Sequence, residues 1–178
     1  MSEARVLGIA GWSGSGKTTL ITKLIPLLTR RGLRVAALKH AHHSFEVDHA
    51  GKDSYEFRAA GAAEVLVSSS RRWVQMHELG ADEPEASLAA LLRRVSPCDL
   101  ILVEGFKRER HPKLEVFRRA LGVAPLHAAD PRVVAVASDQ SLPEARIPVV
   151  DLNDVAAIAE LVFERALPLS QVLGLLEA

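Results

Sequence analysis

The sequence predicts an α/β fold: a three-layer sandwich of helices around a predominantly parallel sheet, with an antiparallel edge. Two observations lead to this prediction. Short apolar runs alternate along the chain with segments of helical periodicity, as in folds whose parallel strands are buried between helices. The first apolar run, Arg5–Ala10, continues into residues 11–18 (GWSGSGKT), which match the phosphate-binding pattern G-x-x-x-x-G-K-[ST] at every specified position. The motif indicates a fold of the P-loop NTPase type.

The glycines of this loop allow left-handed backbone conformations, so that the loop N–H groups and the following helix N-terminus can point at a phosphate. Lys17 is expected to reach the β- and γ-phosphates and to act in catalysis, and the Thr18 hydroxyl to hold Mg²⁺. The loop residues expected to bind nucleotide are Gly11, Ser13, Gly14, Ser15, Gly16, Lys17 and Thr18.

The elements after the loop follow from periodicity and turn residues. Apolar residues at helical spacing over residues 20–28 predict a helix that Gly32 ends, and residues 33–38 predict a second buried strand. Asp53, with a glutamate three positions on, is expected to cap a short helix that stops near Gly61. The later elements are a hairpin of residues 64–68 and 72–76, a helix over 84–94, strands over 100–103, 114–117, 133–137 and 147–152, and a last helix capped by Asn153 that runs to about residue 167.

Acidic residues at the carboxyl ends of strands are the candidate metal ligands, because ligands of such sheets bind there. Glu104 follows the apolar run of residues 100–103, whereas Asp99 precedes it and would lie about 16 Å away along a strand at ~3.3 Å per residue. We therefore choose Glu104 as the second group, after Thr18, at the metal and as a catalytic candidate. Asp48 and Asp53, which follow the second strand, are further metal candidates. The competing interpretations are a turn-capping role for Glu104 and a helix-capping role for Asp53.

Four histidines, at positions 40, 42, 43 and 49, lie within ten residues of the polar loop that follows the second strand. Neutral imidazoles at this density can bind a transition metal, or they can form hydrogen bonds with phosphate, backbone or a partner. Lys39 and His40 stand at the tip of the strand and are the candidates for contact with the nucleotide phosphates.

The base-binding residue is the hardest to predict. The guanine-reading tetrad Asn-Lys-x-Asp is absent, since Asn153 is the only asparagine. Asp139 follows a late strand in the run Ala137-Ser138-Asp139, where its carboxylate could accept the N1 and N2 protons of guanine. The alternative is an ordinary strand-end turn, in which aspartate is favoured.

A basic segment follows Glu104 and has six cations against two acids within thirteen residues. It is either a solvated face or a site for a phosphorylated ligand or an acidic partner. Its cations are Lys107, Arg108, Arg110, Lys113, Arg118 and Arg119, and its acids are Glu109 and Glu115.

Composition sets the broad class. At 178 residues, 48% of them apolar, the chain is expected to form a single P-loop nucleotide-binding domain over residues 1–178. Its zero net charge argues against a general nucleic-acid binder, and no run reaches the ~18 apolar residues of a membrane span. One cysteine, Cys98, excludes an internal disulfide and fits a reducing cytosol, so we expect a cytoplasmic protein without a leader peptide.

Four blocks, in order along the chain, resemble the MobB family of molybdopterin-guanine dinucleotide biosynthesis adapter proteins: AGWSGSGKTTL, KHAHHSFEVDHAGKDSYEFRAAGA, DLILVEGFK and VVAVASD. The resemblance implies a GTP-binding, typically homodimeric adapter with weak GTPase activity that uses Mg²⁺ in molybdenum cofactor biosynthesis. Its partner would be the MobA-type guanylyltransferase that attaches GMP to molybdopterin, with molybdopterin itself a candidate ligand. By position, Thr19 would join Gly14, Gly16, Lys17 and Thr18 in binding phosphate and metal, with Glu104 as the strand-end acid. The P-loop variant with an extra lysine near its start is absent, since Trp12 and Ser13 stand there.

Two other classes use the same loop. A small-molecule kinase could use Arg108 and Arg110 as a lid, and a metal-delivery GTPase could use the histidine-rich loop. The sequence places no glutamine or arginine clearly for orienting water or stabilising transferred charge, so slow hydrolysis is expected in either case.

Overall fold

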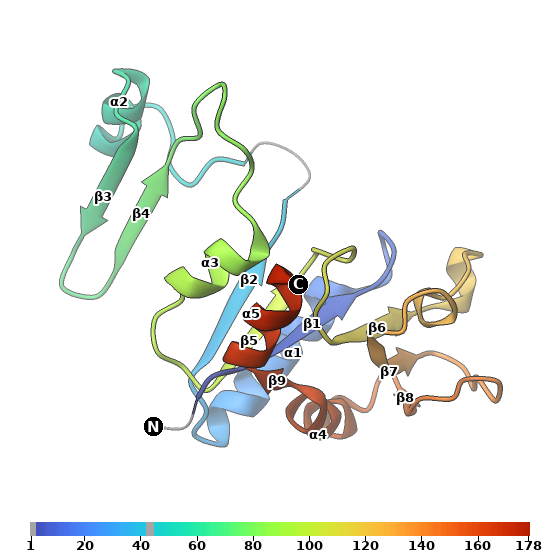
Figure 1. The fold of residues 1–178 in the computed structure, drawn as a ribbon. Helices are drawn as coiled ribbons and strands as arrows, with labels where there is room; N and C mark the ends of the chain where they lie inside the picture. Colours follow the sequence, from blue (N-terminus) through green and yellow to red (C-terminus); the bar gives the residue numbers. More distant parts are fainter. Residues whose placement is uncertain (1–2, 42–44) are drawn as a thin grey trace. The chain divides into compact units, whose positions relative to one another are not determined.

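Parallel strands in the order β2-β5-β1-β6-β7-β8 form the main sheet of the chain (Figure 1). The computed structural model describes residues 3–41 and 45–178. The strands are β1 (Arg5–Ala10), β2 (Val35–Lys39), β5 (Leu100–Glu104), β6 (Lys113–Phe117), β7 (Val133–Ser138) and β8 (Val149–Asp151). A two-residue strand, β9 (Leu167–Pro168), pairs antiparallel with the start of β1. The predominantly parallel sheet with an antiparallel pair confirms the predicted fold class.

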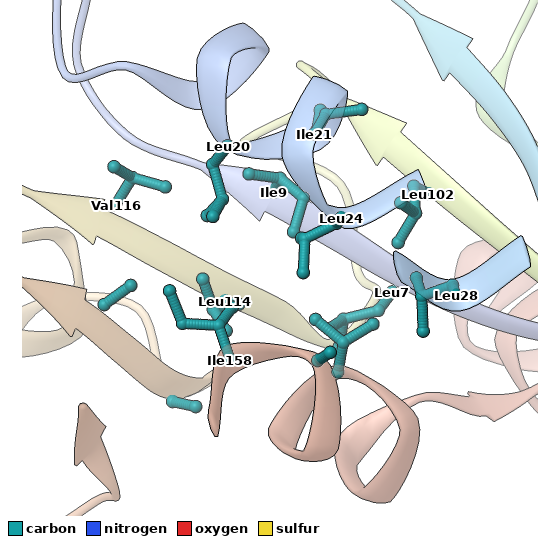
Figure 2. Close-up of a cluster of buried hydrophobic side chains, with 14 of the residues drawn as sticks. Leu7, Ile9, Leu20, Ile21, Leu24, Leu28, Leu102, Leu114, Val116 and Ile158 are labelled. Atoms are coloured by element: carbon teal, nitrogen blue, oxygen red, sulfur yellow. The ribbon is translucent and has the colours of Figure 1, made fainter. Parts of the chain in front are cut away.

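Helices cover both faces of this sheet. Because successive residues of a strand point to opposite sides, each strand contributes side chains to the cores on both faces. Leu7 and Ile9 of β1 pack with α1 (Lys17–Arg30) and α4 (Val155–Arg165), as Figure 2 shows with Leu24 of α1 and Ile158 of α4 between the elements. On the other face, Val6 packs with α3 (Leu88–Arg94) and α5 (Leu169–Glu177). The result is the expected sandwich of three layers. The loop after β1 therefore follows a central strand that is buried from Val6 to Ala10.

The chain divides into two compact units, one of residues 1–40 and 88–178 and the other of residues 41–87. The second unit contains α2 (Asp53–Ala59) and an antiparallel hairpin of β3 (Glu64–Ser68) and β4 (Trp73–His77). Val65 and Met76 are opposite each other and buried, whereas the hairpin exposes large apolar side chains of both strands. The hairpin agrees with the sequence prediction. The single domain expected over residues 1–178 stays a prediction.

Two helix caps differ from the sequence prediction. Lys52, in an extended conformation, is the N-cap of α2, so Asp53 is the first helical residue and makes no capping hydrogen bond with its side chain. Its charge still lies in the first turn, where the helix dipole favours an acid. Asp154, not Asn153, caps α4 and accepts a hydrogen bond from the Ala157 N–H at 2.9 Å. Asn153 instead donates to Asp151 through its backbone and its side chain, which places it in the turn before the helix.

Boundaries moved at several other elements. The third helix begins at Leu88 rather than residue 84, and α5 follows β9 where no helix was expected. Pro168 interrupts the helical pattern there, because it cannot continue α4, but it is well suited to precede the first turn of the next helix. No helix among the described residues is long and apolar enough to cross a membrane.

Candidate nucleotide-binding site

The loop between β1 and α1 has the backbone that an anion site requires. Gly14 and Gly16 have φ angles of 77° and 97°, which side-chain-bearing residues rarely adopt. Gly16 is the N-cap of α1 and accepts a hydrogen bond from the Leu20 N–H at 2.9 Å, so the helix starts directly at the loop. The pocket here has a volume of about 390 Å³ and is lined by Ser13, Gly14, Gly16, Lys17, Thr18, Thr19 and Glu104.

The predicted metal-site pair lies together in the pocket. The Thr18 hydroxyl donates to the Glu104 carboxylate, at 2.9 Å from Oε1 and 3.0 Å from Oε2. Glu104 is the last residue of β5 and pairs in register with Lys39 of β2, whose ammonium lies 3.7 Å from Oε1. Asp99 lies before β5, where its carboxylate accepts a hydrogen bond from the Arg34 N–H. Glu104, rather than Asp99, is therefore the carboxylate beside the loop.

Lys17 folds over the start of the loop. Its ammonium donates to the carbonyls of Gly11 and Trp12, at 2.9 and 3.0 Å. Burial lowers the pKa of Lys17, Glu104 opposes this shift, and the ammonium groups of Lys107 and Lys39 add to it. A negative charge placed in the pocket would relieve this repulsion, so the local electrostatics favour an anion.

Arg118 is a loop contact that the sequence did not reveal. It follows β6, the neighbour of β1, and its Nε donates to the Ser15 carbonyl at 2.9 Å. The Ser15 side chain is buried under the loop, close to Gly11, and its N–H donates to the Trp12 carbonyl. The strand-end rule that selected Glu104 also points to Arg118, because Glu104 ends β5 and Arg118 directly follows β6, and these two strands flank β1.

Asp139 lies just after β7, on the same side of β1 as Arg118. Its Oδ1 accepts a hydrogen bond from the Arg119 N–H at 3.1 Å, and its Oδ2 lies 3.9 Å from Nη1 of Arg118. These contacts tie Asp139 to the segment after β6, and the hydroxyl of Ser138, rather than Asp139, accepts the local hydrogen bond from the Gln140 N–H. A carboxylate has about four acceptor positions, so these contacts leave capacity for the edge of a base.

Among the remaining metal candidates, Asp48 and Asp53 belong to the unit of residues 41–87, and their assignment as metal ligands stays a prediction. Asp48 lies 2.7 Å from Arg58, which also bonds Glu46 and Glu78. Within residues 3–41 and 45–178, no group of three or more His, Cys, Asp or Glu side chains could hold a metal ion.

The histidine-rich loop is only partly described. His42 and His43 lie outside the described residues, and His49 is exposed. The His40 ring lies against that of Phe106, with centroids 4.7 Å apart, and the backbone N–H of His40 donates to the Glu104 carbonyl at 2.9 Å. His40 is thus fixed to the end of β5, next to the predicted metal pair.

The basic segment is not one surface, contrary to the sequence expectation. Lys113 is buried in β6, where its ammonium bonds Asp130 at 2.9 Å and the Glu109 carbonyl at 2.7 Å. Glu115 is also buried and accepts hydrogen bonds from the N–H groups of Leu126 and His127. The partners of these two charges come from residue 109 and from residues 126–130, outside the strands of the sheet. The exposed cations of the segment near its start are Lys107, Arg108 and Arg110.

Comparison with known proteins gives a consistent result. The family model described as "Molybdopterin guanine dinucleotide synthesis protein B" (MobB) matches residues 6–139. The molybdopterin-guanine dinucleotide biosynthesis adapter protein of Escherichia coli K12 is 48% identical over 162 residues, which cover 89% of this chain and 91% of that protein. The protein of the same description from Haemophilus influenzae is 41% identical, over 90% of this chain and 89% of its own. The crystal structure of Bacillus subtilis MobB has a TM-score of 0.71 at 25% sequence identity, and the match covers 92% of this chain and 98% of that chain.

Proposed function

The chain belongs to the MobB family, and we propose that it is a GTP-binding adapter protein of molybdopterin guanine dinucleotide biosynthesis. The observation that supports nucleotide binding most strongly is the phosphate loop, with Thr18 and Glu104 in contact at its helix end. The adapter role is supported by the relatives that have this description and align along nearly their whole length.

Phosphate and metal binding are assigned to the pocket of the loop. The loop N–H groups cradle the phosphates and Lys17 exchanges the Gly11 and Trp12 carbonyls for phosphate oxygens. The donor set fits Mg²⁺, because the Thr18 hydroxyl and the Glu104 carboxylate converge and both are hard oxygen ligands. Bound Mg²⁺ neutralises the charge that the β- and γ-phosphates share.

Guanine choice is assigned to Asp139. In the sheet order, β6 and β7 lie on one side of β1 and β5 on the other, so a nucleotide with phosphates at the loop can extend its base toward the end of β7. Asp139→Ala should then reduce the ratio of GTP to ATP affinity and leave the phosphate contribution unchanged. A competition titration of both nucleotides checks this. An unchanged ratio in the variant would remove Asp139 from base recognition.

Turnover is expected to be slow. Arg118 is engaged with the Ser15 carbonyl, and the described residues that line the pocket around Thr18 and Glu104 include no arginine. In the GTPases where it has been measured, an arginine placed at the terminal phosphate raises the rate of hydrolysis by about 10³–10⁵-fold. Without such an arginine, we expect hydrolysis to be slower by a factor of this size. Hydrolysis at about 1 per second or faster, by the protein alone, would contradict this expectation.

A homodimer is proposed through the hairpin of the second unit. Leu66 and Trp73 lie on the same face of the hairpin, since Trp73 pairs with Ser68, and they are 64% and 61% exposed, so this face offers an apolar surface that a second copy would bury. Trp73→Lys should shift the species measured by light scattering toward the monomer. A dimer of unchanged stability would assign the contact to another surface.

The guanylyltransferase partner is proposed to contact the exposed start of the basic segment, through Arg108 and Arg110. Reversal of both to Glu should weaken association with that partner and leave GTP binding unchanged. Exposed ionic contacts are screened by salt, so the association should also weaken as ionic strength rises. If the double variant instead loses GTP while partner binding persists, these arginines serve the nucleotide site, and a lid-bearing kinase becomes the better account.

A further inference from the structure

Lys107 is held over the indole ring of Trp12. Its ammonium lies 4.6 Å from the ring centroid, in a cation–π contact between the end of β5 and the start of the phosphate loop. Trp12 also donates from Nε1 to the Ala124 carbonyl at 2.9 Å, so the ring is fixed on its other edge. Two lysines thus converge on one loop residue: Lys17 on the Trp12 carbonyl and Lys107 on its ring.

The backbone before Lys107 is shaped to aim it there. Gly105 and Phe106 have φ angles of 97° and 48°, and Phe106 is the only non-glycine residue with a positive φ in the described part of the chain. Such conformations persist only where the surroundings enforce them. Here His40 does so, since its ring packs on Phe106 and its Cβ would lie 2.7 Å from a Cβ at Gly105. The ammonium of Lys107 is therefore delivered to the loop by a rigid turn.

The turn at Gly105 and Phe106 lies on the side of the loop where the terminal phosphate of a nucleotide would be bound. The glycine-rich part of the loop cradles the α- and β-phosphates, and the metal lies between the β- and γ-phosphates. Glu104 marks the metal position on the β5 side of β1, and Lys107 is only three residues further along the same chain segment. Arg118 and Asp139 mark the opposite, β6–β7 side. Lys107 thus lies at the terminal-phosphate end.

We propose that Lys107 is a sensor of the terminal phosphate, which leaves the Trp12 ring to bind the γ-phosphate of a nucleoside triphosphate. This inference rests on the proposed GTP binding and goes further, because it assigns the distinction between triphosphate and diphosphate to one side chain. A hydrogen bond to a phosphate is stronger than an exposed cation–π contact, so the exchange is favourable. With a diphosphate bound, Lys107 stays on Trp12.

The test uses the full-length protein with Trp73→Phe, which leaves Trp12 as the only tryptophan. Affinities for GTP, a non-hydrolysable GTP analogue and GDP are measured with Mg²⁺, together with Trp12 emission. Lys107→Met should leave GDP affinity unchanged and lower triphosphate affinity by about 10- to 100-fold. The triphosphates, but not GDP, should change Trp12 emission, and Lys107→Met should abolish this difference. Lys107→Arg should restore part of the discrimination.

Lys23→Met is the matched control, because it removes the same charge from an exposed position of α1. Its ratio of GTP to GDP affinity should equal that of the parent. If Lys107→Met also keeps the parent ratio, or if GDP and GTP change Trp12 emission alike, the sensor role is wrong while GTP binding stands. If the parent binds neither nucleotide, the proposed function is wrong and the sensor role fails with it.

Discussion

Acidification from pH 7 to pH 5 should lower the free energy of unfolding by about 2 kcal/mol through protonation of one imidazole, that of His111. This loss follows from the lowered pKa of His111 in the folded state. His111 is fully buried against Gly8 of β1, the strand that leads into the phosphate loop. The pKa of His111 is lowered from 6.5 to about 3, chiefly by burial and also by the neighbouring Lys113 cation, while Asp130 opposes the shift. The native state therefore holds this imidazole neutral.

Proton binding by the unfolded chain explains why the protein loses stability as the pH falls. Between the folded pKa of about 3 and the unfolded value of 6.5, the unfolded chain binds a proton that the native state does not. Stability is thus fully present above pH 6.5 and is lost as pH falls below it, at up to ~1.4 kcal/mol per pH unit. Burial raises the pKa of Asp130, but hydrogen bonds from the Arg132 N–H and from Lys113 outweigh it and lower this pKa, so the carboxylate affects stability only below its ordinary pKa of 3.8. The window from pH 7 to pH 5 therefore separates the titration of His111 from that of Asp130.

Urea unfolding followed by circular dichroism at pH 7 and pH 5 measures this loss. His111→Leu, which removes the titrating ring, should lose about 2 kcal/mol less than the parent over this range, or show a drop in Tm smaller by about 4–8 °C. His49→Leu removes an exposed imidazole and serves as the control, with the full parental loss. Equal losses in the parent and in His111→Leu would refute the assignment of this buried neutral ring.

Three further variants test the strand and the loop. Gly8→Ala should destabilise the protein by about 1–3 kcal/mol, the usual cost of overpacking, because the added Cβ would clash with Nε2 of His111. In a double-mutant cycle of unfolding free energies, His111→Ala should remove most of the destabilisation that Gly8→Ala causes. Lys17→Ala should weaken GTP binding by about 10- to 150-fold in calorimetric titration, since a charged hydrogen bond to phosphate is lost. Thr18→Val should abolish the part of GTP affinity that depends on Mg²⁺ while affinity in EDTA stays at the parental value; an equal loss in both conditions would place Thr18 on phosphate rather than on metal.

The predominantly parallel sheet was predictable because β1, β5 and β7 are largely apolar on both faces. Runs such as Leu100–Glu104 have few alternatives to a buried parallel strand, and the glycines of the loop specify a turn directly after β1. The same strand-end rule correctly placed Glu104 beside Thr18. Local signals were less decisive at helix starts, where Asn153 and Asp154 are both good caps and only the backbone geometry selects Asp154.

The buried charges were not predictable from the local sequence. Lys113 and Glu115 alternate with the apolar Leu114 and Val116, a pattern typical of a strand with one solvent-exposed face. In the structure, loops that come back from residues 109 and 126–130 bury both charges and supply their partners. The sequence likewise placed Arg118 in a basic surface segment. Its contact with Ser15 could not be seen there, because the two residues are 103 positions apart. Its place directly after β6 was the available signal, through the strand-end rule, whereas the contact with Ser15 itself leaves no local signal.

The central claim is that the loop of residues 11–18 binds guanine nucleotide together with Mg²⁺. Calorimetric titration of the purified protein with GTP and with ATP, each with Mg²⁺ and with EDTA, tests it most directly. The account predicts that GTP binds more tightly than ATP, and that removal of Mg²⁺ weakens GTP because Thr18 and Glu104 lose the ion they would hold. Equal affinity for the two nucleotides would contradict the guanine assignment, and no binding of either would contradict the nucleotide site itself.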